Sequence, residues 1–351
     1  MEYANFIARC IEIARRGEYF VAPNPMVGAV LVRNSDEAIL AEGWHERYGE
    51  GHAEVNCLRN FEKTITNHKS PITNLKDCTL FVSLEPCSHY GKTPPCAKLI
   101  IEKGVGRVVV GMLDPNPLVA GRGIQMLRDA GIEVVVGVLE QACRELNKRF
   151  LCLHEKHRPY VVLKWAQTAD GYVDRNRRIG DCSLVIGDLH LNGALAISTP
   201  ETKKLVHKMR AENMAIMVGT NTVLLDNPRL KNTHWEGRDP IRVTMDAHHR
   251  IPADARIFSD GIEGKDPIIY RDRTDWPFIL SDLAQRNIHS VLVEGGPTLL
   301  RHILATGMWD EMHVEIAPEL RIGEGVPAPE IALPDSFKTV DGHRLYVKKN
   351  E

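Results

Sequence analysis

Apolar and polar positions alternate along the first half of the chain with two different periods. Phe6, Ile7, Cys10 and Ile11 recur at the spacing of one helix face, which predicts a helix over residues 3–16. Short apolar stretches have the length of buried strands. Further helices are expected over residues 52–62, 95–103, 123–130 and 140–153, and strands over residues 27–33, 79–84, 107–112 and 132–136. Strands and helices that alternate in this way predict a layered α/β domain.

A second α/β segment follows the short charged stretch His154–Pro159, which ends in proline and which we interpret as a linker. Strands are expected over residues 160–166, 214–218, 241–245, 267–270, 290–293 and 312–316, and helices over residues 200–211 and 297–305. The segment Asp174–Asn192 has no clear period and is expected to be a loop. The chain of 351 residues therefore predicts two domains, residues 1–153 and 160–351, joined by the linker at 154–159.

The charge balance narrows the range of partners. The chain has 44 Lys and Arg against 46 Asp and Glu, so it lacks the basic surplus of a general nucleic-acid or membrane-surface binder. No apolar run approaches the ~18 residues of a membrane helix, and charged residues interrupt the N-terminal segment, so we expect neither a membrane span nor a signal peptide. Eight scattered cysteines then favour metal binding or burial over disulfides. We expect a cytoplasmic protein.

A set of zinc ligands is the clearest chemical motif of the first domain. His52 opens a predicted helix, Cys87 follows a strand, and Cys96 comes nine positions later, behind two prolines. Three such ligands leave a fourth position open for water, as hydrolytic zinc sites do. Glu54 could carry protons without binding the ion. A fourth ligand, such as His89 or Cys57, would instead make a closed structural site.

These motifs resemble those of the bifunctional riboflavin-biosynthesis deaminase/reductase family. The resemblance rests on the long loop from Cys87 to Cys96, on Pro23–Gly28, on His52–Val55, and on Asp114-Pro115-Asn116-Pro117 with the glycines after it. It continues beyond Arg158-Pro159 to the end of the chain. It implies a cytidine-deaminase-like three-layer domain, followed by a dihydrofolate-reductase-like α/β domain.

The family resemblance implies two successive reactions on a small phosphorylated pyrimidine. The first is hydrolytic deamination of a diaminopyrimidinone that bears a ribose 5-phosphate, with one Zn²⁺ held by His52, Cys87 and Cys96 and with Glu54 as the proton shuttle. The second is reduction of the ribosyl group to ribityl by NADPH.

The resemblance also assigns binding residues in both domains. The expected substrate contacts are Asn24, His89, Lys92, Arg210, Leu230 and Glu294. The expected cofactor contacts are Ala166, Thr222, Asp226, Gly296, Pro297, Thr298, Leu299, Leu300, Arg301 and His302. His89 and Lys92 could meet the phosphate, although both could also be exposed loop residues. Glu294 or Asp226 could handle the proton that accompanies the hydride.

The second domain gives one local signal of its own. Gly295 and Gly296 join a predicted strand to a predicted helix, whose first N–H groups could hold a phosphate, although a tight turn without a ligand has the same pattern. No G-x-G-x-x-G motif is present, so a Rossmann site is not expected.

The second domain departs from the family at two places. Ala194 and Ala196 stand where the family commonly has Ser and Trp. Thr233 stands where it usually has Arg, a loss for which Arg229 or Lys231 could substitute.

Two other functions stay open at this point. The first domain could deaminate another base, such as a tRNA adenosine, but the near-neutral charge and the long loop between Cys87 and Cys96 argue against it. The second domain could be a non-catalytic interaction or assembly module, an alternative that Thr233 and Ala196 keep open. We expect a homo-oligomer that acts on a small molecule.

Overall fold

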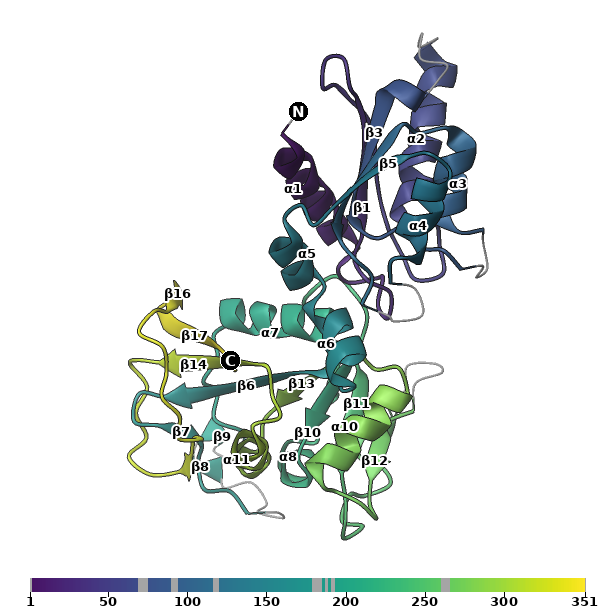
Figure 1. Cartoon of the computed structure of the whole chain (residues 1–351). Helices are drawn as coiled ribbons and strands as arrows, with labels where there is room; N and C mark the ends of the chain where they lie inside the picture. Colours follow the sequence, from purple (N-terminus) through teal and green to yellow (C-terminus); the bar gives the residue numbers. More distant parts are fainter. Residues whose placement is uncertain are drawn as a thin grey trace. The chain divides into compact units, whose positions relative to one another are not determined.

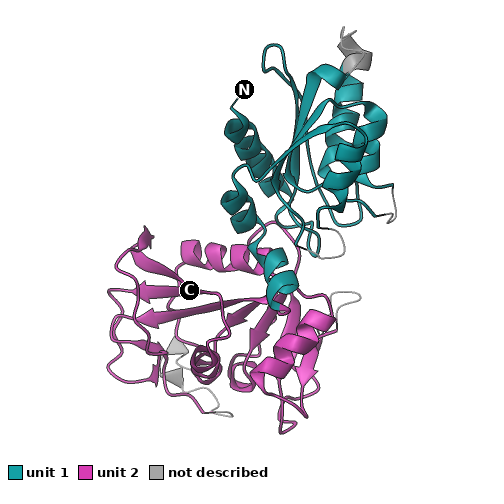
Figure 2. Ribbon diagram, in the orientation of Figure 1, with its two compact units in different colours: residues 1–156 teal, residues 157–351 magenta. Residues whose placement is uncertain are grey.

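The computed structural model describes residues 2–68, 75–89, 94–115, 120–178, 185–186, 189–190, 193–259 and 266–350. The chain divides into two compact units, residues 1–156 and 157–351 (Figure 2). Helix α6 spans Lys148–Lys156, so residues 154–156, which we expected in the linker, are helical and belong to the first unit. A separate helix α5 spans Glu140–Leu146, and the two are divided at Asn147 where one continuous helix was expected.

A five-stranded sheet forms the centre of the first unit, in the order β2-β1-β3-β4-β5. The strands are β1 (Gly28–Arg33), β2 (Ile39–Trp44), β3 (Cys78–Leu84), β4 (Arg107–Met112) and β5 (Glu133–Val136). β1 runs antiparallel to both of its neighbours, whereas β3, β4 and β5 are parallel. Strands β1, β3 and β4 are almost wholly buried, which explains their continuous apolar sequence.

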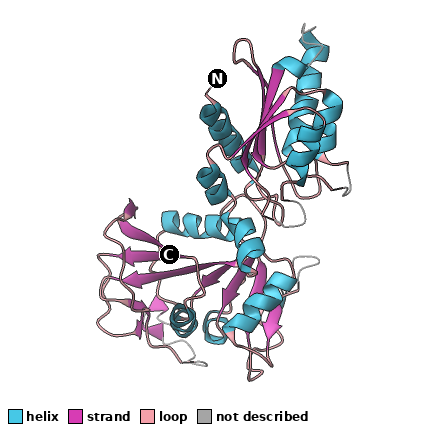
Figure 3. Ribbon diagram, in the orientation of Figure 1, coloured by secondary structure: helices cyan, strands magenta, loops and turns pink. Residues whose placement is uncertain are grey.

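Helices cover both faces of this sheet and make three layers (Figures 1 and 3). Helices α2 (Ala53–His68), α3 (Cys96–Lys103) and α4 (Arg122–Asp129) lie on one face, and α1 (Tyr3–Ala14) and α5 lie on the other. Successive strand residues point to opposite faces. Leu31 therefore packs with Leu58 of α2, whereas Val30 and Val32 pack with Ile7 of α1. The expected three-layer domain is confirmed.

An eight-stranded sheet forms the second unit, in the order β12-β11-β10-β13-β6-β14-β17-β16. Its strands are β6 (Tyr160–Thr168), β10 (Ala215–Val218), β11 (Ile241–Met245), β12 (Ile268–Tyr270), β13 (Ser290–Glu294), β14 (Glu311–Ala317), β16 (Lys338–Val340) and β17 (His343–Lys349). The first six in this order are parallel, β17 is antiparallel to β14, and β16 is antiparallel to β17. The parallel strands place their carboxyl ends at one edge, where ligands bind in open α/β sheets.

Two short strand pairings and five helices complete the described part of the second unit. β7 (Tyr172–Asp174) pairs with β15 (Val326–Pro327), and β8 (Val185–Ile186) pairs with β9 (Leu189–His190), so the segment expected as a loop contains short strands. The helices are α7 (Pro200–Glu212), α8 (Thr220–Asp226), α9 (Arg256–Ser259), α10 (Trp276–Gln285) and α11 (Pro297–Thr306). Helices α10 and α11 pack on one face of the sheet through Ile279 and Ile303. None of the helices in the described segments is long and apolar enough to cross a bilayer.

Candidate functional site

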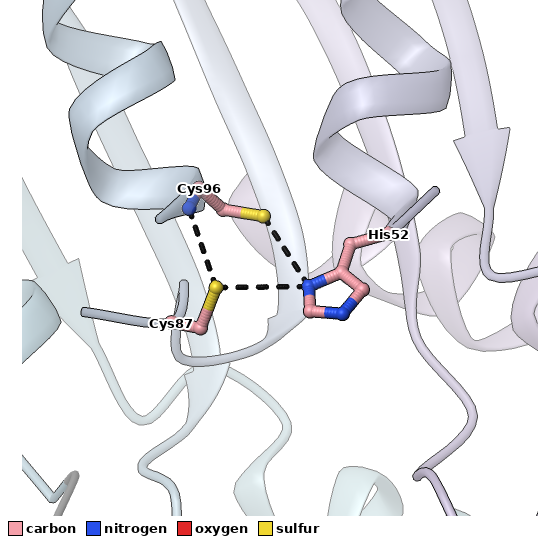
Figure 4. Close-up of side chains that lie close together, drawn as sticks. All are labelled: His52, Cys87 and Cys96. Atoms are coloured by element: carbon pink, nitrogen blue, oxygen red, sulfur yellow. Dashed lines mark hydrogen bonds between the residues drawn. The ribbon is translucent and has the colours of Figure 1, made fainter. Parts of the chain in front are cut away.

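His52, Cys87 and Cys96 converge at the start of two helices of the first unit (Figure 4). His52 directly precedes α2, Cys96 is the first residue of α3, and Cys87 lies in the loop after β3. The Nδ1 atom of His52 lies 3.6 Å from Sγ of Cys87 and 3.4 Å from Sγ of Cys96. All three ligand atoms lie within 4.8 Å of one another, so one nitrogen and two sulfurs surround a space that suits a single Zn²⁺.

The two candidates for a closing fourth ligand lie elsewhere. Among the residues that the structure describes, the cluster contains His52, Cys87 and Cys96 alone. Cys57 is buried in the core, where its thiol donates to the carbonyl oxygen of Ala41 at 3.5 Å. His89 is exposed and lines the cavity beside the cluster. A three-ligand set is the arrangement that hydrolytic zinc sites use.

The pKa of Cys87 suits metal binding, and the pKa of Glu54 suits proton transfer. Hydrogen bonding from Cys96 lowers the pKa of Cys87 to about 4, which favours the thiolate that binds metal. Glu54 lies in the first turn of α2 and is 3% exposed. Burial raises the pKa of Glu54 to about 7. A carboxyl group with such a pKa can accept and release a proton near neutral pH.

A cavity of about 260 Å³ adjoins the cluster, and Asn24 and Glu54 both line it. His45, another lining residue, fixes the orientation of Asn24. Its Nδ1 donates to the carbonyl oxygen of Gly51 at 3.0 Å, so its Nε2 accepts from the Asn24 amide at 3.0 Å. Burial lowers the pKa of His45, which keeps the ring neutral in this arrangement. The NH₂ group of the Asn24 side chain thus faces His45, and its amide oxygen, Oδ1, can accept a hydrogen bond from a ligand.

Helix α6 supplies a wall of the same cavity that the sequence did not indicate. Phe150 and His154 line the cavity, and their ring centroids lie 4.5 Å apart. Asn147, just before α6, accepts from the N–H of Met26 at 2.8 Å and donates to its carbonyl oxygen at 2.9 Å. This pair of bonds ties the loop that carries Asn24 to the start of α6. The signal was missed because His154 falls in a stretch whose charge and proline predicted a linker.

Glu85 supports another part of the cavity wall. Its side chain is 4% exposed and lines the cavity together with Asp114. Four backbone N–H groups donate to its two oxygens, those of Asp114 (3.2 Å), Gly121 (3.0 Å), Gly123 (2.9 Å) and Ile124 (3.4 Å). A Cβ at Gly123 would lie 2.0 Å from the carbonyl oxygen of Pro86, so only glycine allows this close approach. The carboxylate thus holds both the start of α4 and the residues before it.

A second cavity, of about 1110 Å³, lies at the carboxyl ends of the parallel strands of the second unit. Most of the residues that the resemblance assigned to it do line it: Ala166, Thr222, Asp226, Gly296, Pro297, Thr298, Leu299, Leu300, His302, Arg210 and Glu294. Leu230 is 5% exposed and packs in the apolar core, and Arg301 donates to the carbonyl oxygen of Pro327 at 2.6 Å, so neither lines the cavity. Lys92 lies outside the described residues.

Opposite charges meet on one side of this cavity. Two nitrogens of Arg210 donate to the carboxylate of Glu294 at 2.7 and 2.6 Å. Burial acts to raise the pKa of Glu294, but the charge and hydrogen bonds of Arg210 outweigh it, so that pKa is lowered. Lys164, on the neighbouring strand β6, is a lining residue that the sequence analysis did not assign. Burial lowers its pKa, against the opposing effect of Glu294.

The positions that depart from the family lie at or near the same cavity. Ala194 and Ala196 line it. Thr233 is exposed, and its N–H donates to Nδ1 of His207 at 3.1 Å. His207 lines the cavity, and burial together with Arg210 lowers its pKa to about 4. Thr233 thus contacts a residue of the cavity wall without lining the cavity itself.

Comparisons with known families match both units. The cytidine and deoxycytidylate deaminase zinc-binding region matches residues 1–112, and the RibD C-terminal domain matches residues 159–332. The riboflavin biosynthesis protein RibD of Bacillus amyloliquefaciens is 37% identical over 359 residues, which cover 95% of this chain and 89% of that protein. The Escherichia coli RibD protein is 34% identical and covers 91% of this chain and 89% of its own length.

Solved structures give the same result. A diaminohydroxyphosphoribosylaminopyrimidine deaminase/5-amino-6-(5-phosphoribosylamino)uracil reductase from Thermotoga maritima is 34% identical, with a TM-score of 0.81 and coverage of 98% of this chain and 97% of that chain. The RibD protein of Acinetobacter baumannii is 30% identical, with a TM-score of 0.81 and 98% coverage of both chains.

Proposed function

The chain belongs to the RibD family of bifunctional riboflavin-biosynthesis enzymes, and we propose which of its residues carry each reaction. It is a zinc-dependent deaminase and an NADPH-dependent reductase. The substrate is a small molecule, 2,5-diamino-6-(5-phosphoribosylamino)pyrimidin-4(3H)-one, whose ribosyl group is reduced to ribityl after deamination. The match over residues 159–332 does not favour a non-catalytic second domain.

In the deaminase, His52, Cys87 and Cys96 hold the zinc ion. When bound, zinc supplies a water whose pKa is low enough to give hydroxide near neutral pH. Glu54 would carry a proton from the attacking water to the amino group that leaves as ammonia. The pyrimidine binds at Asn24, whose carbonyl oxygen accepts from the ring substituents, and His89 and Lys92 bind the phosphate. The observation that supports this assignment best is the compact ligand set beside a buried carboxyl group of pKa about 7.

Substitution of Glu54 by Gln tests the deaminase assignment. Gln keeps the shape and the hydrogen bonds of the side chain but cannot carry a proton. We expect Glu54→Gln to keep one zinc per chain and to lose deamination by about 10² to 10⁴-fold, with reduction of the deaminated substrate unchanged. Glu62→Gln, an exposed change in the same helix, is the matched control. Deamination near the parent rate would remove Glu54 from the mechanism.

In the reductase, the cofactor binds along Ala166, Thr222, Asp226 and the cavity-lining residues of the segment from Gly296 to His302, and the substrate binds at Arg210 and Glu294. NADPH supplies the hydride, and the chain orients the two reactants. The ion pair with Arg210 keeps Glu294 ionised, so Glu294 holds substrate hydroxyls and is a poor acid. Asp226 forms an ion pair with Arg177 at 2.6 Å.

Lys164 is the better proton donor of this site. It is half-buried beside Glu294, and its lowered pKa makes it a stronger acid than an exposed lysine. We expect Lys164→Met to lower kcat of the reductase and to remove the alkaline limb of its pH profile, with deamination unchanged. A pH profile that keeps its alkaline limb in this variant would exclude Lys164 as the donor.

The oligomeric state and the cellular location belong to the same proposal. We propose a homo-oligomer that acts in the cytoplasm without a nucleic-acid or membrane partner. The near-neutral charge supports the absence of those partners. Light scattering of the purified full chain tests the oligomer, and a monomer at micromolar concentration would refute it.

A further inference from the structure

We propose that Arg250 binds the 2′-phosphate that distinguishes NADPH from NADH. This inference rests on the proposed reductase function, because it assigns one end of the cofactor cavity. Arg250 is exposed, follows strand β11 by five residues, and lines the cavity of the second unit. No basic motif in the sequence pointed to the feature that selects the phosphorylated cofactor.

The order of the strands sets the direction of the cofactor in this cavity. Lys164 and Glu294 lie on β6 and β13, whereas Asn221 and Arg250 follow β10 and β11, on the other side of β13 in the sheet. The Gly295-Gly296 turn after β13 lies between these two halves. A cofactor with its nicotinamide at the β6 half and its diphosphate at this turn extends its adenosine toward β10 and β11. Its 2′-phosphate therefore comes to the half that contains Arg250.

Arg250 differs from the other two arginines that line the cavity in the kind of group that it contacts. Arg177 is paired with the carboxylates of Asp174 and Asp226, and Arg210 is paired with Glu294. The side-chain bond that the structure gives Arg250 runs instead to a neutral group, from Nη2 to Oδ1 of Asn221 at 3.2 Å. Its positive charge is thus not engaged by a carboxylate in that bond, and its remaining N–H donors can meet a phosphate.

The other cationic lining residues lie toward the substrate half. Lys203 is on helix α7, which also carries Arg210, and Lys164 is half-buried on β6. A guanidinium also matches a phosphate better than an ammonium does, because its planar donors form two parallel hydrogen bonds.

The backbone around Arg250 is fixed before any ligand binds. Asp246 is 1% exposed, and its two oxygens accept from the N–H groups of Arg250 at 2.8 Å and Ile251 at 3.2 Å. The hydroxyl of Thr220 donates to the carbonyl oxygen of Met245 at 2.5 Å, which joins the start of α8 to the end of β11. These bonds bring Asn221 and Arg250 together at the rim. A preorganised cation loses less entropy on binding.

The test uses the full-length chain and compares two cofactors, NADPH and NADH, and two smaller nucleotides that carry or lack the 2′-phosphate. For Arg250→Ala, we expect kcat/KM with NADPH to fall about tenfold or more, and kcat/KM with NADH to change by less than about twofold. Binding of 2′,5′-ADP, measured by calorimetry, should weaken similarly, whereas binding of 5′-AMP should not change. Arg250→Lys should keep part of the preference. Arg271→Ala, an exposed change outside the cavity, is the control.

Two results would overturn the assignment. An unchanged NADPH-to-NADH ratio in Arg250→Ala would place the 2′-phosphate elsewhere. An equal loss with both cofactors would make Arg250 a general contact and not a discriminating one. Failure of the proposed function has a different signature, since the parent protein itself would then not reduce the deaminated substrate with NADPH.

Discussion

Replacing Glu85 by Gln changes one atom and should loosen a wall of the deaminase cavity. The two oxygens of Glu85 accept from four backbone N–H groups, two each. The amide of Gln offers one oxygen and one NH₂ group, so two of the N–H groups lose their acceptor and face another donor. The contacts with Gly123 and Ile124 belong to the first turn of α4, and those with Asp114 and Gly121 to the residues before it.

The size of the effect follows from these contacts. A buried donor left without an acceptor costs about 1–3 kcal/mol, and loss of a negative charge at a helix N-terminus costs about 0.3–1 kcal/mol. Asp114 is partly exposed, so water can replace some of its lost bond. We expect a local destabilisation of about 2–4 kcal/mol, equivalent to at least a tenfold change in local opening.

Hydrogen exchange measures this opening residue by residue. In Glu85→Gln, the amides of Gly121, Gly123 and Ile124 should exchange at least tenfold faster, with strand β3 unchanged. The KM for deamination should rise because Asp114 lines the cavity, whereas zinc content should stay at the parent level. Glu102→Gln, an exposed change on α3, is the control. Parent-like exchange and KM together would show that Glu85 does not hold this wall.

Three further predictions concern the metal, the substrate phosphate and the pH dependence. Cys96→Ala should lose tightly bound zinc, measured by metal analysis, whereas the core variant Cys57→Ala should keep it; full retention in Cys96→Ala would refute the ligand set. Thr233→Arg should lower the reductase KM by roughly tenfold through a bidentate phosphate contact, with Thr233→Ala as control; equal KM values would place the phosphate elsewhere. Burial lowers the pKa of His45 below its usual 6.5, so the unfolded chain takes up this proton first as the pH falls. The free energy of unfolding of the first unit should therefore decrease as the pH falls below about 6.5, and denaturant titrations should find less of this decrease in His45→Gln.

Strands buried on both faces were predictable, because their burial leaves a continuous apolar run. Residues 79–84 and 107–112 were expected as strands and correspond to β3 and β4. Strand β2 was not predicted, since it is an edge strand that mixes apolar residues with Glu42 and Gly43. Its place depends on a distant contact: a Cβ at Gly43 would lie 2.2 Å from the backbone nitrogen of Cys57 in α2.

Helix α10 shows the opposite case, a local signal that was overlooked. Asp275 precedes the helix, its side chain accepts from the N–H of Phe278 at 3.1 Å, and Pro277 stands in the first turn. An aspartate followed closely by proline is a sequence signature of a helix start.

The residues of the site also fall into two groups, those that the sequence marks and those that only the folded arrangement identifies. The zinc ligands and Glu54 are recognisable because metal chemistry restricts residue types and spacing. Glu85, Asn147 and His154 act through contacts that the fold creates, such as the bonds from Asn147 to Met26, 121 positions away in the chain. No local pattern marks such residues, so only the folded arrangement could identify them.

Product analysis with the ribosyl diaminopyrimidinone 5′-phosphate tests the central claim most directly. The purified full chain with zinc should release one ammonia per substrate without NADPH and accumulate the deaminated ribosyl compound. Addition of NADPH should convert that compound to the ribityl product, with one NADPH oxidised per molecule. Absence of ammonia release, or ammonia release without any NADPH-dependent ribityl product, would contradict the account of a chain that carries both reactions.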